Sequence, residues 1–103
     1  FPKMPFVALD AMTSPENLEQ LIGLAEDCPN VFLDLTSSLI GPRGVERAVR
    51  RLGSERLVFG SNCYSMSRVE RVSALDVVRE AGLDETQRAA ILGGNARKVL
   101  GLP

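Results

Sequence analysis

The stretch Arg56–Cys63 (RLVFGSNC) decides the fold that the sequence predicts. A basic residue is followed by the apolar run Leu57–Phe59, and the run stops at Gly60-Ser61-Asn62. A short apolar run with such an ending is typical of a buried parallel strand that leads into a tight loop. Because α/β proteins build their sites in the loops after strand C-termini, Ser61–Tyr64 is the first candidate for a functional site.

Two more segments have the pattern of strands, Pro5–Asp10 (PFVALD) and Val31–Thr36 (VFLDLT). In the second, the odd-numbered residues are apolar and share one side, while Phe32, Asp34 and Thr36 share the other. This pattern favours an apolar face packed on helices and a more mixed face turned toward a barrel interior.

Helical patterns alternate with these strands. Apolar residues recur at helical spacing, and three capping-box patterns, Thr13-x-x-Glu16, Ser67-x-x-Glu70 and Asp84-x-x-Gln87, mark helix starts. A loop is expected over Ser37–Gly44. The expected helices run from Thr13 to before Pro29, from Val45 to Gly53, from Ser67 to Gly82 and from Asp84 to before Gly101.

The order β-α-β-α-β-α-α predicts an α/β fold with a parallel sheet, in one domain that spans residues 1–103. Three βα units can cover one face of such a sheet but leave the other bare, which is rarely stable. We therefore expect the missing cover to come from more of the same barrel or from a partner chain, such as a second copy. The start at Phe1, without an initiator methionine, also suggests a piece of a longer polypeptide.

Composition narrows the functional classes. The 103 residues are 45% hydrophobic and 24% charged with a net charge of -1, which predicts a soluble globular domain and does not point to nucleic acid. No apolar run approaches a membrane span, and Cys28 and Cys63 are expected to be reduced thiols in a cytoplasmic protein. The chain has no histidine, the usual general base and transition-metal ligand.

Three segments together resemble the C-terminal part of the amidohydrolase-related family, which are metal-dependent TIM-barrel hydrolases and decarboxylases. They are Asn30–Ser37 (NVFLDLTS), Arg56–Asn62 (RLVFGSN) and Ala90–Leu102 (AILGGNARKVLGL). The resemblance implies the last three βα units of a (β/α)8 barrel followed by a terminal helix. It also implies hydrolysis or decarboxylation of a small carboxylate or amide substrate, and a divalent metal such as zinc or manganese.

The sequence departs from that family at two places. Asn62 stands where family members are expected to carry an aspartate that serves as metal ligand or general base, and an asparagine cannot take a proton from water. The end of the Pro5–Asp10 strand, where a metal-linked histidine is expected, offers Asp10 or Ala11. These departures predict a degenerate site that holds metal weakly or not at all, so no residue is assigned as a metal ligand. The alternative is a non-catalytic barrel remnant that acts as a structural or partner-binding module.

Five residues form the predicted site: Asn62 and Asp10 as catalytic groups, and Arg43, Cys63 and Tyr64 as substrate-binding groups. Three of them have structural alternatives, because Asn62 and Asp10 are of types common in turns and a small thiol such as Cys63 is often buried. Arg43 is expected in a loop after a strand, where it could meet an anionic substrate, whereas Arg47, Arg50 and Arg51 are expected on the solvated face of their helix. Asp34 is either a barrel-facing polar core residue, paired with an arginine, or a direct participant. Gly93 and Gly94 are expected to allow close packing of the last helix.

Overall fold

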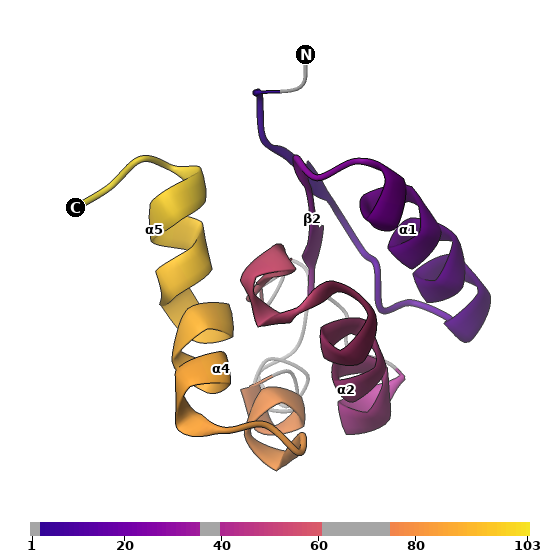
Figure 1. The fold of residues 1–103 in the computed structure, drawn as a ribbon. Coiled ribbons are helices and arrows are strands. Elements are labelled where there is room, and N and C mark those ends of the chain that lie inside the picture. Colours follow the sequence, from indigo (N-terminus) through magenta and orange to yellow (C-terminus); the bar gives the residue numbers. More distant parts are fainter. Residues whose placement is uncertain (1–2, 36–39, 61–74) are drawn as a thin grey trace.

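The computed structural model describes residues 3–35, 40–60 and 75–103, which form an α/β fold around a three-stranded sheet (Figure 1). The strands are β1 (Phe6–Ala8), β2 (Val31–Asp34) and β3 (Leu57–Val58), in the spatial order β1-β2-β3. Both pairings are parallel, so the predicted parallel sheet is confirmed. Each strand is shorter than the segment for which the sequence predicted it.

The helices lie between and after the strands. Apart from a helical segment at residues 75–80, they are α1 (Pro15–Asp27), α2 (Gly41–Leu52), the 3-10 turn η1 (Ser54–Arg56), α4 (Glu85–Ala89), the π-helical turn η2 (Ala90–Gly94) and α5 (Asn95–Val99). The segments α4, η2 and α5 follow one another as a continuous helical stretch (Figure 1). No helix in residues 3–35, 40–60 and 75–103 combines the length and the apolar character that crossing a membrane would need.

The hydrophobic core lies between α1, α2 and one face of the sheet. Leu33 and Leu57 are opposite each other in the register, and both are fully buried, as is Leu35 just after β2. The helices contribute apolar residues at i, i+3 and i+4 spacing, and those that are buried include Leu18, Ile22, Ala25, Val45 and Ala48. The odd-numbered face of the Val31–Thr36 run is therefore the helix-packed face, as its alternation predicted.

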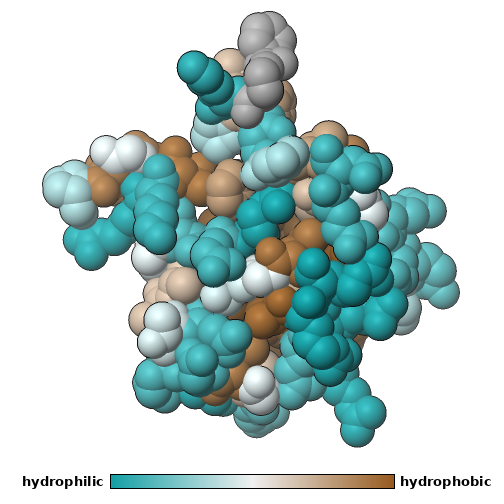
Figure 2. All heavy atoms as spheres, viewed as in Figure 1, coloured by the Kyte–Doolittle hydropathy of each residue, from teal (hydrophilic) through white to brown (hydrophobic). Residues whose placement is uncertain are grey.

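The opposite face of the sheet is less well covered. Val7 lies beside Phe32 in the parallel register, and Asp34 lies beside Val58. Val7 is 38% exposed, and Leu9, two residues later and just beyond β1, is 69% exposed. In Figure 2, brown hydrophobic residues show between teal hydrophilic ones in the centre of the view, around η1 and α2 rather than on this face of the sheet. The expectation of an incompletely covered sheet agrees with these exposures within the described residues.

Of the predicted capping boxes in the described residues, Asp84-x-x-Gln87 is confirmed, and Thr13-x-x-Glu16 is wrong because Ser14 is the N-cap of α1. Ser14 caps α1, because its hydroxyl accepts a hydrogen bond from the Asn17 amide at 3.1 Å, and Pro15 occupies the first turn. Asp84 and Gln87 form a complete capping box at the start of α4. The Ser67-x-x-Glu70 pattern lies outside the described residues.

Two expectations about glycines and helix bounds are wrong. The expected loop Ser37–Gly44 ends early, because Gly41 adopts a φ of +71° and Pro42 suits the first turn, so α2 starts at Gly41. A side chain added at Gly93 would meet no other described atom within 4 Å, so close packing does not explain this glycine. Gly93 and Gly94 instead form the end of the π-helical turn η2.

The outer edge of β3 is capped by the C-terminal helical stretch. The Asn95 side-chain amide donates hydrogen bonds to the carbonyl oxygens of Leu57 at 2.7 Å and Ser54 at 2.6 Å. One residue beyond β3, the Phe59 amide donates to the carbonyl oxygen of Ile91 at 3.1 Å. Asn95 is 2% exposed, so these contacts satisfy polar groups that water cannot reach.

Arg56 joins the start of β3 to the end of α1. Its guanidinium group donates to the carbonyl oxygens of Ala25 at 2.8 Å and Cys28 at 2.7 Å, and through Nε to that of Val31 at 2.9 Å. It also lies 5.8 Å from the centre of the Phe32 ring, within the range of a cation–π contact. Arg56 therefore holds the start of β3 against the end of α1.

We predict that Asn95→Ala destabilises the fold by about 2–3 kcal/mol, since it leaves two buried carbonyl oxygens without a partner. Urea denaturation followed by circular dichroism measures the change. Asn17→Ala is the control, because the Asn17 side chain bonds to the Asp10 carbonyl and Thr13 near the surface. The control should cost about 1 kcal/mol or less. Equal losses in the two variants would contradict a special role for Asn95.

Ion pairs from Glu19 and Glu26 of α1 to Arg47 and Arg51 of α2 generate a prediction for pH. Glu19 contacts Arg47, and Glu26 contacts Arg51 at 2.6 Å. The hydrogen bonds from these arginines lower the pKa of each carboxyl group in the folded state. Because a lowered folded-state pKa stabilises the fold above the unfolded value of about 4.3, stability should fall as the pH drops from about 5 to about 3.

The Glu26→Gln variant should show a smaller fall in its urea midpoint over this pH range than the unmodified chain. High salt should reduce the difference, because both groups of each pair are solvent-exposed. An unchanged pH profile in the variant would show that this pair does not contribute.

Candidate functional site

The C-terminal end of β2 carries a buried carboxylate. Asp34 is the last residue of β2 and is 8% exposed. It lines a cavity of about 250 Å³ on the less covered face of the sheet, together with Val58, Phe59 and Gly60 from β3 and its exit. The remaining lining residues are Val7, Ala96, Val99 and Leu100, so β1 and the terminal helix close the other sides.

This arrangement follows directly from the strand pattern. Asp34 and Val58 are register partners in neighbouring parallel strands, so their side chains lie on the same face. The carboxyl ends of parallel strands share one edge of the sheet, where α/β proteins place their ligands. The cavity therefore combines an otherwise apolar wall with one acidic group, at the edge where a site is expected.

Asp10 occupies a turn outside this cavity. It follows β1 by two residues and adopts a φ of +58°, a conformation that aspartate tolerates better than most residues. Its backbone carbonyl accepts hydrogen bonds from the Thr13 hydroxyl at 3.1 Å and the Asn17 side-chain amide at 2.9 Å. The structural alternative for Asp10 therefore has support, and this exposed residue is not among those that line the Asp34 cavity.

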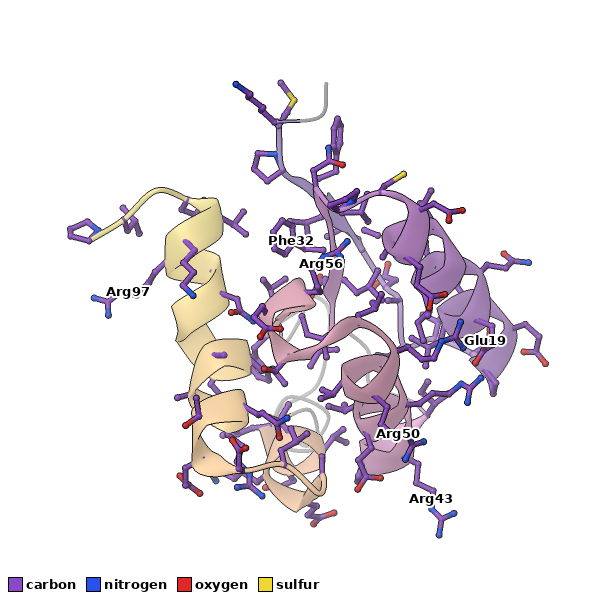
Figure 3. The ribbon with its side chains drawn as sticks, in the orientation of Figure 1. Glu19, Phe32, Arg43, Arg50, Arg56 and Arg97 are labelled. Atoms are coloured by element: carbon purple, nitrogen blue, oxygen red, sulfur yellow. The ribbon has the colours of Figure 1, made fainter. Side chains whose placement is uncertain are left out.

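Arg43 is not a loop residue, contrary to the sequence-based prediction. It lies in the first turn of α2 and is exposed. Figure 3 shows its side chain extending outward from α2 into solvent. It borders a separate hollow with Pro42, Glu46 and Arg50, and the Asp34 cavity does not include it. The early start of α2 explains this difference, because it places Arg43 on the outer side of a helix.

The other three predicted site residues, Asn62, Cys63 and Tyr64, lie outside the described residues. Gly60 is part of the cavity wall and precedes Asn62 by two positions in the sequence. The assignment of Asn62, Cys63 and Tyr64 to a site stays a prediction.

The described residues do not fit a divalent metal site on their own. Within residues 3–35, 40–60 and 75–103, no group of three or more aspartate, glutamate, cysteine or histidine side chains is placed to hold an ion. Zinc sites usually take three or four such ligands, and this chain has no histidine. Asp10 follows β1 and Asp34 ends β2, and of these two aspartates only Asp34 lines the cavity.

Asp34 lines the cavity although it was not among the five residues of the predicted site. The signal was the position of a carboxylate on the mixed side of the Val31–Thr36 run, between two apolar residues of the packed side. Local sequence patterns do not show that β2 pairs with β3. This pairing places Asp34 beside Val58, in the cavity that Gly60 also lines.

Comparison with known proteins gives one clear result. A search of curated proteins found no match. The model of the amidohydrolase family matches residues 1–102, which is almost the whole chain. This agrees with the resemblance carried by the two described strands β2 and β3 and by the terminal helix. The chain therefore belongs to the amidohydrolase family.

Proposed function

We propose that this chain forms the C-terminal βα units of an amidohydrolase-like TIM barrel that hydrolyses or decarboxylates a small carboxylate or amide substrate. The observation that carries the proposal is the position of Asp34, in an apolar cavity at the carboxyl ends of parallel strands. Active sites of TIM-barrel enzymes are built at that end. Membership of the amidohydrolase family supports the reaction class.

Asp34 is the group that we assign to the substrate. A carboxylate can accept a hydrogen bond from a substrate amide N–H or from water, and it can accept a proton, which Asn62 cannot do. The apolar wall made by Val58 and Phe59 keeps water away from the carboxylate and strengthens such contacts. Asn62 would then orient the substrate through its amide.

The family implies a divalent metal, which would polarise the substrate or activate water. Since the described residues do not provide a set of three ligands, we assign no step to a metal. We propose that the metal site is degenerate and that any zinc or manganese is weakly held.

The non-catalytic alternative is favoured by a separate observation. Asn95 and the Ile91 carbonyl cap the β3 edge, where a closed barrel would need the next strand to pair. The less covered sheet face with Val7 and Phe32 would then serve to bind a partner chain. In this second candidate function, the cavity at Asp34 is not a catalytic site.

The test is turnover of a panel of small carboxamides and carboxylates by the chain, assayed after exhaustive dialysis and again with added zinc or manganese. We predict that Asp34→Asn lowers turnover about 100-fold or more, because it removes the proton acceptor while keeping the side-chain shape. Asp10→Asn is the matched control and should stay within about threefold, the scale of a modest change in binding.

Circular dichroism checks that both variants are folded, and elemental analysis gives the metal content of the dialysed protein. A metal content well below one ion per chain is expected. Equal losses in the two variants would contradict the role of Asp34. No turnover of any compound, with or without metal, would contradict the enzymatic proposal and favour the partner-binding alternative.

A further inference from the structure

A second cavity in the described part of the chain lies at the other end of the sheet from Asp34. It has a volume of about 500 Å³, which is within the usual range for a small-molecule site. Its lining includes Pro5, Asn30 and Arg56, which directly precede β1, β2 and β3, and α5 forms the opposite wall. The Asp34 cavity and this one share Val99 in their linings, so they are neighbours along α5.

The floor of this cavity is held in place by contacts that do not depend on a ligand. Arg56 is fixed by carbonyl oxygens of α1 and of the following loop, and Phe32 lies under its guanidinium group. Figure 3 shows Phe32 and Arg56 next to each other between α5 and α1. Asn95, which also lines the cavity, is fixed by its bonds to Ser54 and Leu57. A floor fixed in this way reduces the entropy lost on binding.

The charges around the cavity are mostly positive. Lys3, Arg56 and Lys98 contribute three cations to the lining, against one carboxylate from Glu55. Every hydrogen bond that the structure gives the Arg56 side chain within the described residues comes from Nε or Nη2. The two hydrogens on Nη1 are therefore not used in those bonds, and an arginine nitrogen of this kind is a strong donor to carboxylates.

The apolar part of the lining comes from Phe32, Val99 and Pro5. A ring face and two aliphatic side chains favour a ligand with a flat or compact apolar body. We propose that this cavity binds a small monocarboxylate with an aromatic or apolar body, with the carboxylate toward Arg56 and Lys98 and the body against Phe32. This site is separate from the one proposed for turnover, since it lies at the opposite ends of the strands.

The test uses benzoate as the probe and follows backbone amide chemical shifts of the whole chain by NMR. Saturable shifts are expected at Asn30, Phe32 and Lys98, with a dissociation constant on the order of 1 mM for a ligand of this size. Benzamide has the same body without the charge and should bind at least about tenfold more weakly, as expected when a charged hydrogen bond is lost.

Variants locate the charge that matters. Lys98→Met keeps most of the side-chain length and should weaken benzoate binding about threefold to fivefold, the effect of one partly exposed ion pair. Arg97→Met is the matched control, because Arg97 is the adjacent cation on α5, does not line the cavity, and points away from it in Figure 3. It should leave the affinity unchanged.

Several outcomes would overturn the proposal. They are the absence of saturable shifts at millimolar benzoate, equal binding of benzamide, equal weakening by Arg97→Met, or shifts confined to Asp34 and Phe59. The last outcome would place the ligand in the cavity of the proposed catalytic site instead. Asp34→Asn changes the other cavity, so this variant should bind benzoate in the cavity of Arg56 and Lys98 with unchanged affinity.

Discussion

The hydrogen bonds at the outer edge of β3 are the contacts on which the rest of the arrangement depends. An exposed strand edge presents unpaired amide and carbonyl groups that attract other strands. Here the Leu57 carbonyl is bonded to the Asn95 side chain, and the Phe59 amide is bonded to the Ile91 carbonyl. Ile91 and Asn95 are four residues apart, so they share one helix face across η2. The terminal helix thereby fixes one side of the sheet and leaves β1 as the other edge strand.

The same helix divides the less covered face of the sheet into two environments. Near the carboxyl ends of the strands, an apolar wall surrounds Asp34, and near the amino ends, Arg56 and two lysines gather around Phe32. α5 borders both, and Val99 lies in both linings. One sheet face therefore offers an acidic cavity and a basic cavity, which suits different ligands at opposite ends of the strands. Both proposals rest on this separation of charge along a single surface.

Local sequence signals predicted much of the fold. The alternation of apolar residues indicated the strands and the packed face, and Asp84 with Gln87 marked the start of α4. The start of α2 could not be predicted, because it depends on the conformation of Gly41. The roles of Asn95 and Arg56 depend on contacts with residues 25 or more positions away, which local patterns do not encode. The prediction of Arg43 in a loop is wrong because α2 starts at Gly41. The position of Asp34 in the cavity depends on the pairing of β2 with β3, which local patterns do not encode.

The most direct measurement is hydrogen exchange at the Phe59 amide, compared with the Leu35 amide, which bonds to the Val58 carbonyl inside the sheet. If the terminal helix caps β3, both amides should exchange at slow rates within about tenfold of each other, as members of one cooperative unit. Exchange of the Phe59 amide at the rate of a solvent-exposed amide, with Leu35 still protected, would show that the β3 edge is open and would contradict the account.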